Sequence, residues 1–214
     1  MKKNIIFSIL LSLIFIGCAT TSKNLNDKNY KKNTADKSPL TQKQIEAQTY
    51  KLEILKTSCD NSQNPQVCEQ VGDSANALGK YDIAIKYYDI SCKQNFFSSC
   101  IKLANVYETA TQSNIKDEIK ALQIYDQTCK KGDKFSCTKA GNFFYKKDDI
   151  KTALEYFNYA CGLYEMKSCF LMAEIFEKGK GEIPKDLEIA KNIYTTICFR
   201  GDSDGCKKMK ELDK

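Results

Sequence analysis

The sequence has 214 residues, 42% of them hydrophobic, so it can bury a substantial core either as one domain or as an extended array. Its formal net charge of +6 comes from 33 basic and 27 acidic residues, a mixture without the concentrated basic face that nucleic-acid binding requires. Because the sequence contains no histidine, Ser-His-Asp and Cys-His catalytic centres and histidine metal sites are excluded.

Residues 1–17 predict a secretory signal peptide. Two lysines precede a mostly apolar run from Ile5 to Ile16, which is too short to span a bilayer core about 30 Å thick. The segment from Phe15 to Cys18 resembles a bacterial lipobox, in which cleavage occurs before a lipidated cysteine. We therefore expect lipidation at Cys18, with a plain signal peptide as the alternative. By resemblance to lipoprotein sorting in Gram-negative bacteria, Ala19 favours the outer membrane, facing the periplasm or the cell surface.

Residues 18–40 predict a lipidated N-terminus and a flexible linker. The stretch after Cys18 is rich in Lys, Asn, Thr, Ser and Asp and has almost no apolar periodicity. About 20 such residues have a root-mean-square reach on the order of 25 Å, enough to hold a domain away from a membrane surface. Residues 41–214 are then the expected repeat domain.

The helices of this domain are predicted from positions counted from the cysteines. Thr41 to Gln44 fit a capping box, and an apolar stripe with helical spacing runs from there to Cys59. Before each later cysteine pair, a small residue and an aromatic residue stand four apart on one helix face. These are Ala84 and Tyr88, Ala121 and Tyr125, Ala153 and Phe157, and Ala190 and Tyr194. Small and mostly aromatic residues also recur after each pair, which predicts a second helix and a helical hairpin as the unit.

The spacing of the units indicates a repeat architecture. The first cysteines of the pairs lie 33, 37, 32 and 37 residues apart, a period typical of stacked helix pairs. The longer units carry their extra residues in loops at 110–116 and 179–185, which should lie on the same edge of the stack. We predict an all-α solenoid of about four and a half antiparallel helix pairs.

Ten of the eleven cysteines form five close pairs. In a continuous helix, residues eight apart are separated by about 12 Å, whereas a disulfide needs Cα atoms within about 7 Å, so the helix must end between them. Gly132 and Gly201 provide helix stops before an aspartate N-cap, and Asn95 and Gly162 can serve at other pairs. Because export into an oxidising compartment favours disulfides, we expect five. The pairs are Cys59 and Cys68, Cys92 and Cys100, Cys129 and Cys137, Cys161 and Cys169, and Cys198 and Cys206.

Metal binding and redox catalysis are the alternative interpretations of these cysteines. Structural zinc sites usually bring thiolates in C-x(2–4)-C pairs, and dithiol oxidoreductases use C-x-x-C. The sequence contains neither spacing, so we expect no metal and no cofactor.

One repeat is especially regular. It runs from Ala173 to Gly181 and continues through Lys185, Asp186, Ala190, Tyr194, Cys198, Gly201 and Cys206. With this repeat, the segment 45–214 resembles the Sel1-like repeat family, in particular its cysteine-rich branch, the Helicobacter cysteine-rich proteins. Repeats of 32 or 33 residues are shorter than the family pattern, and the extra residue between Cys59 and Cys68 also departs from it. The resemblance implies a right-handed superhelix that binds proteins or peptides and is exported or associated with the cell envelope.

Two near-copies, Ser99 to Lys102 and Ser136 to Lys139, contain the S-x-x-K pattern of serine β-lactamases. Some members of the cysteine-rich branch are described as penicillin-binding or as slow β-lactamases, so the resemblance implies such a hydrolase as the alternative function. Serine β-lactamases also need S-D-N-like and K-T-G elements, and the sequence has neither.

The same lysines support a binding hypothesis. Lys102 with Asn105, and Lys139 with Asn142, stand three residues apart on one helix face. By resemblance, these helices line a groove, and the pairs are similar to the clamp with which tetratricopeptide domains hold peptide backbone and terminal carboxylates. The simpler interpretation is a solvated face of an amphipathic helix. The expected partner is a protein or peptide, with a peptidoglycan-like peptide among the candidates; we expect membrane contact only through the N-terminal lipid.

Overall fold

Ten helices make up most of residues 41–213, the part of the chain that the computed structural model describes. The signal peptide, the lipidation at Cys18 and the linker predicted for residues 1–40 lie outside the described residues. The helices are α1 (Gln42–Ser62), α2 (Pro65–Ala77), α3 (Tyr81–Lys93), α4 (Phe97–Thr109), α5 (Glu118–Lys130), α6 (Lys134–Lys146), α7 (Ile150–Gly162), α8 (Met166–Lys178), α9 (Leu187–Phe199) and α10 (Ser203–Glu211).

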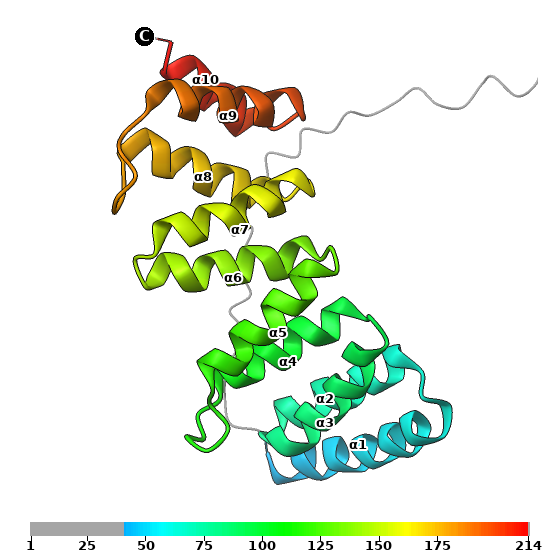
Figure 1. Ribbon diagram of the computed structural model, residues 1–214. Coiled ribbons are helices and arrows are strands. Elements are labelled where there is room, and N and C mark those ends of the chain that lie inside the picture. Colours follow the sequence, from blue (N-terminus) through cyan, green and yellow to red (C-terminus); the bar gives the residue numbers. More distant parts are fainter. Residues whose placement is uncertain (1–40, 214) are drawn as a thin grey trace, which may run out of the picture. The chain divides into compact units, whose positions relative to one another are not determined.

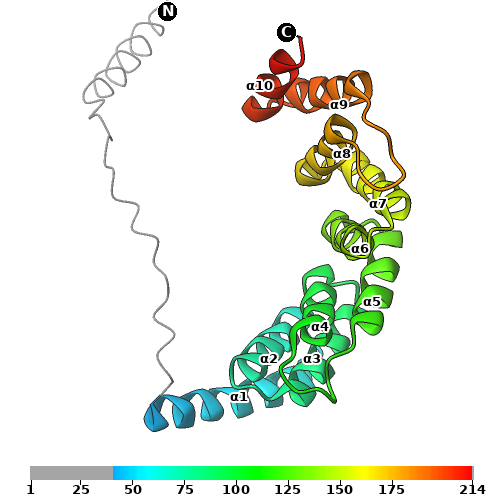
Figure 2. The ribbon, with the colours of Figure 1, turned by 90° about the vertical axis from the view of Figure 1, so that its left-hand side faces the viewer.

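The helices stack in chain order, and each packs against the helix before it and the helix after it (Figure 1). In Figure 2, α4 and α6 lie along one side of the stack, and α5 and α7 lie along the other. The loops at 110–116 and 179–185 lie on the same edge, as expected (Figure 1). The prediction of an all-α solenoid of stacked antiparallel helix pairs is confirmed. None of the helices within 41–213 has both the length and the apolar character needed to cross a bilayer.

Five disulfides join consecutive helices, and we refer to each turn with its disulfide as a joint. Each bond links the end of one helix to the beginning of the next, with Cα–Cα distances of 4.4–5.0 Å. The five predicted pairs are confirmed, including Cys59–Cys68, whose longer spacing departs from the others.

At four of the joints, the first helix ends at a residue with left-handed backbone conformation, and the sequence predicts three of these four residues. Gly132, Gly201 and Asn95 have φ angles of 95°, 90° and 62°, in the left-handed region that ends a helix, as predicted. At the fourth joint the prediction of Gly162 is wrong, because α7 includes Gly162 and Tyr164 takes the left-handed conformation, with φ 63°. At all four of these joints the left-handed residue is the third after the first cysteine. Its position in the turn, rather than its residue type, therefore determines which residue takes the left-handed conformation, and at the fourth joint this residue is a tyrosine.

The core is built from the small and aromatic positions counted from the cysteines. The aromatic residues four positions before the first cysteine are all buried, and they are Tyr88, Tyr125, Phe157 and Tyr194. The rings of Tyr88 and Phe157 approach the preceding helix where it carries a glycine, Gly72 and Gly141 respectively. At Gly141, for example, an added Cβ would lie 2.6 Å from Phe157 Cε1, so only glycine admits the ring this closely. The alternation of small and large residues thus sets the distance between neighbouring helices.

Candidate functional site

Lys102, on α4, is bound to two carboxylates of the preceding repeat. Its ammonium group lies 2.8 Å from Glu69 Oε1 and 2.8 Å from Asp73 Oδ2, both on α2. The Ser99 hydroxyl, also on α4, donates to the other Glu69 oxygen at 2.7 Å. Burial by itself would lower the pKa of Lys102, but the hydrogen bonds to Asp73 and Glu69 outweigh burial and raise the pKa. Lys102 therefore stays charged and ties α4 to α2.

The same three-part contact recurs along the stack. A tyrosine donates its hydroxyl to a carboxylate on the helix before it, and a lysine on the helix after it pairs with that carboxylate. We call these contacts tyrosine–carboxylate–lysine clusters. They are Tyr88–Asp73–Lys102, Tyr125–Glu108–Lys139 and Tyr194–Glu177–Lys208. Each cluster joins three consecutive helices, which begin with α2, α4 and α8 respectively.

The tyrosines of the clusters act as fixed hydrogen-bond donors. Burial, reinforced by the neighbouring carboxylate, raises the pKa of Tyr88, Tyr125 and Tyr194 well above the usual tyrosine value. Each phenol therefore keeps its proton at physiological pH, and its hydroxyl donates to a charged acceptor. Hydrogen bonds to charged groups contribute about 1.5–3 kcal/mol each, so the clusters stabilise the contacts between repeats.

The stretch α6–α7–α8 lacks such a cluster. Asn142 occupies the position equivalent to Asp73, Phe157 replaces the tyrosine, and Leu171 replaces the lysine. Since neither Phe157 nor Leu171 can donate a hydrogen bond, the Asn142 amide has no cluster partner. This part of the stack is held by apolar packing, with Phe157 and Ile175 buried in one core cluster, and by a buried hydrogen bond between the Thr138 and Ser168 hydroxyls, 2.7 Å apart.

Lys139, on α6, hydrogen-bonds an asparagine of the preceding repeat. Its Nζ atom donates to Asn105 Oδ1 at 3.0 Å and lies 3.8 Å from Glu108 Oε2. The Tyr125 hydroxyl lies 2.7 Å from the same Asn105 oxygen and 3.1 Å from Glu108 Oε2, so its one proton is shared between two acceptors. The structure thus brings together two residues of the predicted lysine–asparagine clamp, but from different repeats. Lys102 lies one helical turn from Asn105 on α4 but pairs with carboxylates of α2, and Asn142 lies one turn from Lys139 on α6.

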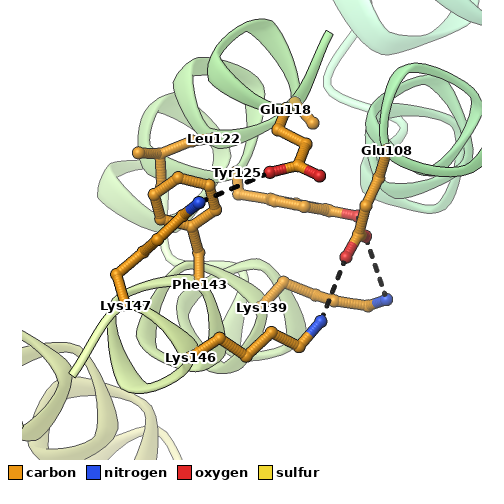
Figure 3. A pocket seen from close by; sticks show the side chains of 9 residues that line it. Glu108, Glu118, Leu122, Tyr125, Lys139, Phe143, Lys146 and Lys147 are labelled. Carbon is orange, nitrogen blue, oxygen red and sulfur yellow. Dashed lines mark hydrogen bonds and ion pairs between the residues drawn. The ribbon is translucent and has the colours of Figure 1, made fainter. Parts of the chain in front are cut away.

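A pocket of about 230 Å³ opens beside Lys139, between α4, α5 and α6. It is lined by Glu108, Glu118, Ala121, Leu122, Tyr125, Lys139, Phe143, Lys146 and Lys147. Figure 3 shows two carboxylates and three ammonium groups spread around the pocket, with the Tyr125 and Phe143 rings and Leu122 among them. The pocket therefore combines apolar surface with a formal charge of +1, because three lysines face two glutamates.

The ion pairs of this pocket are long and exposed. Lys146 lies 3.6 Å from Glu108, and Lys147 lies 3.8 Å from Glu118. The two lysine side chains are 71% and 61% exposed. Exposed ion pairs of this kind contribute between zero and about 1 kcal/mol, so the lysines can turn to a carboxylate from outside at little cost. Lys102, at 2.8 Å from two carboxylates, is less available.

Ser99 and Ser136 are inaccessible to a substrate. Both side chains are 0% exposed, inside the joints that begin α4 and α6. Ser99 donates to Glu69, and the Ser136 hydroxyl has no hydrogen-bond partner among residues 41–213. A nucleophile must reach the carbonyl carbon that it attacks, and neither hydroxyl can do so in this fold. The structure gives no support to the hydrolase alternative.

Most residues that line the pocket could not be predicted from sequence motifs. Glu118 follows the longer loop between α4 and α5, and Lys146 and Lys147 end α6, so none belongs to a repeated position that the cysteine count singles out. The available signal is the pair of adjacent lysines one repeat before the second long loop, which does not by itself indicate a site.

Glu177, in the cluster on α8, is expected to make the free energy of unfolding depend on pH. Burial by itself would raise its pKa, but hydrogen bonds from Tyr194 and Lys208 outweigh burial and hold the pKa of Glu177 below its usual value of 4.5. Such a carboxylate stabilises the fold above its unfolded-state pKa, and this contribution is lost as the pH falls through the folded-state pKa. Glu177→Gln should cost about 1 kcal/mol at pH 7 and less at pH 3, measured by urea denaturation. An equal cost at both pH values would contradict the assignment.

We compared the sequence and the fold with those of known proteins. No family model matches the chain. Cytochrome c oxidase assembly factor 7 of Xenopus tropicalis is 28% identical over 167 residues, which cover 73% of this chain and 72% of that protein. A protective antigen with an SLR fold from uropathogenic Escherichia coli superimposes with a TM-score of 0.57 and 17% identity. That match covers 78% of this chain but only 36% of the antigen, so the chain spans about a third of its length.

Two further solved structures are similar. A Sel1 repeat protein from Oxalobacter formigenes has a TM-score of 0.56 and 20% identity, covering 77% of this chain and 69% of that one. Cysteine rich protein B of Helicobacter pylori is 26% identical, with a TM-score of 0.43, over 60% of this chain and 95% of that one. With the helix order and the five disulfides, the Escherichia coli antigen and the Oxalobacter formigenes protein assign the described residues to the Sel1-like, tetratricopeptide-like solenoid fold.

Proposed function

We propose that this protein is a disulfide-linked module that binds a protein or peptide, and that the pocket between α4, α5 and α6 receives an acidic group of the partner. The observation that carries the proposal is the excess of loosely paired lysines around an apolar pocket. A partner carboxylate can accept hydrogen bonds from Lys139 and Lys146, while an adjacent apolar side chain packs on Tyr125 and Phe143.

Two other observations support a binding role. The solved neighbours share a fold of stacked helix pairs, which presents extended surfaces suited to protein ligands. The relative from Xenopus tropicalis is named an assembly factor, and assembly proceeds through protein contacts. Of the four residues of the predicted clamp, Lys139 lines this pocket and Asn105 accepts a hydrogen bond from it, whereas Lys102 and Asn142 do not line the pocket.

We extend the proposal to the cell envelope. Five disulfides form and persist in oxidising compartments, which supports export. Cleavage after residue 17, lipidation at Cys18 and a linker up to residue 40 would then tether the binding domain to the outer membrane. Mass spectrometry of the mature protein checks this part, since lipidation adds an acyl-glyceryl group to Cys18 and cleavage before Cys18 removes residues 1–17.

The pocket is tested with labelled peptides. Fluorescence anisotropy of the full-length oxidised protein is measured with peptides that end in an aromatic residue and glutamates, and with the same peptides carrying glutamines. We expect the acidic peptides to bind more tightly, and Lys139→Ala or Lys146→Ala to weaken that binding about tenfold, because each removes a charge-assisted hydrogen bond. Lys146→Ala leaves the Tyr125–Glu108–Lys139 contacts in place and so separates binding from stability.

Lys178→Ala is the matched control. Lys178 is 67% exposed and lies 3.4 Å from Glu174 on α8, so its removal takes away one exposed charge outside the pocket. Binding should then stay within a factor of about two. Equal affinity for acidic and glutamine peptides, or an equal loss in all three variants, would show that the pocket does not select carboxylates.

A further inference from the structure

Arg200 lies against the disulfide of the joint before its own. Its Nη1 atom donates to the Cys161 carbonyl oxygen at 2.9 Å, and it lies 3.9 Å from Cys161 Sγ and 3.7 Å from Cys169 Sγ. The guanidinium group also stacks on the Tyr164 ring, 4.6 Å from the ring centroid. The hydrogen bond and the stacking together hold a permanent positive charge beside the two sulfur atoms.

The residues equivalent to Arg200 at other joints make different contacts. Each stands two positions after the first cysteine of its pair. Gln94 donates its side-chain amide to a backbone oxygen of the first joint at 2.9 Å, and Lys131 donates to Asn95 Oδ1 at 3.0 Å. At the Cys161–Cys169 joint itself, the equivalent residue is Leu163. Among residues 41–213, only the Cys161–Cys169 disulfide has an arginine within hydrogen-bonding distance of its sulfur atoms.

The two cysteines of this disulfide differ in access to solvent. Cys161 is partly exposed, whereas Cys169 is fully buried. A thiolate arriving from solvent therefore meets Cys161 Sγ, and Cys169 Sγ becomes the leaving group. Cys169 Sγ is also the sulfur nearer to Arg200. An adjacent cation favours the thiolate form of a cysteine, and a thiol of lower pKa leaves faster in disulfide exchange.

We propose that Cys161–Cys169 is a thiol-exchange site for small thiols such as glutathione, and that Arg200 stabilises the leaving thiolate. Glutathione thiolate attacks Cys161 Sγ, a bond forms between the two sulfur atoms, and the Cys161–Cys169 bond breaks. The electron pair of that bond leaves with Cys169 as a thiolate beside Arg200. The product is a mixed disulfide between glutathione and Cys161, with no net oxidation or reduction.

Complete opening of the disulfide needs a second glutathione. Its thiolate attacks the glutathione sulfur of the mixed disulfide, which releases Cys161 as a thiolate and forms oxidised glutathione. Two electrons pass from the two glutathione molecules to the protein disulfide, and their two thiol protons balance the two new cysteine thiolates. Because the bond joins α7 to α8, opening it releases the covalent link at one joint while the other four remain.

The proposal is tested on the folded full-length protein in glutathione buffer. Samples are quenched at intervals with N-ethylmaleimide, and peptide mass spectrometry gives the opening rate of each disulfide. Cys92–Cys100 is the internal reference, since it also pairs a partly exposed with a buried cysteine and has no arginine. We expect Cys161–Cys169 to open about three- to tenfold faster than Cys92–Cys100, and glutathione to be attached to Cys161.

Three variants then test whether the charge of Arg200 causes the faster opening of Cys161–Cys169. Arg200→Gln should remove the rate advantage of Cys161–Cys169, Arg200→Lys should retain part of it, and Lys131→Gln should leave Cys92–Cys100 unchanged. A variant that merely unfolds would open Cys129–Cys137 faster as well, which separates that effect from loss of the charge. The proposal is overturned if Cys161–Cys169 opens no faster than Cys92–Cys100, if glutathione is attached to Cys169, or if Arg200→Gln opens the bond at the wild-type rate.

Discussion

Replacing Phe157 by alanine is expected to lower the free energy of unfolding by about 3–5 kcal/mol. The side chain is 0% exposed, and its ring lies against the backbone of Gly141. It belongs to α6–α7–α8, where the described stack has no tyrosine–carboxylate–lysine cluster that would also stabilise the contacts between helices. Truncation removes the contacts of the ring and leaves a cavity that two flanking helices cannot fill without moving. Urea denaturation followed by circular dichroism measures the loss.

Two further variants show whether packing at this contact is the cause. Gly141→Ala alone should cost about 1–3 kcal/mol, since its Cβ would lie 2.6 Å from the Phe157 ring. In the Phe157→Ala background the same methyl group enters the cavity, so its cost should disappear or change sign. Phe135→Ala, at a side chain that is 52% exposed, should cost less than about 1 kcal/mol. Strictly additive losses at Gly141 and Phe157 would contradict this explanation.

Removing the Cys129–Cys137 disulfide by substituting alanine for both cysteines should cost about 2.5 kcal/mol. The bond closes a short ring at the joint between α5 and α6, and so it limits the conformations of the unfolded chain. Both sulfur-bearing side chains are also buried, and they pack with Ala160 of the next repeat. Urea denaturation of the oxidised variant and the oxidised wild type gives the difference.

The matched comparison is the same double substitution at Cys198 and Cys206. These residues are partly exposed and lie at the last joint, between α9 and α10. A terminal unit contacts only one neighbour, so losing its disulfide should loosen α10 and affect unfolding of the remaining stack less. A loss below about 1 kcal/mol at the Cys129–Cys137 joint, or equal losses at both joints, would argue against the central joint as a main source of stability.

The architecture could be predicted because cysteine spacing imposes a distance. Residues eight apart cannot be bridged within one helix, so each pair marks the end of one helix and the beginning of the next. The aromatic core positions, such as Tyr88 and Phe157, could be predicted for a related reason, since they recur at a fixed offset from the same cysteines. Periodic features of one repeat carry over to the next.

Contacts between repeats could not be predicted in this way. Lys139 bonds Asn105, 34 positions earlier, and Tyr125 bonds the same oxygen from 20 positions away. Which residue of the preceding helix meets a given side chain depends on the angle and offset between two helices, and the sequence of one repeat contains neither. The pocket adds a further difficulty, because Glu118 follows an irregular loop whose course the repeat pattern does not determine.

The tyrosine–carboxylate–lysine clusters also restrict how such a chain can be rearranged by duplication or recombination of its repeats. Lys102, Lys139 and Lys208 each meet a carboxylate of the preceding repeat, whereas Leu171, at the equivalent position, requires none. If the α7–α8 hairpin were moved into another position, its phenylalanine and leucine would leave a preceding carboxylate without donors. Exchange of single hairpins is therefore penalised, and duplication of longer blocks, with the matching neighbours included, is the route that keeps every charge paired.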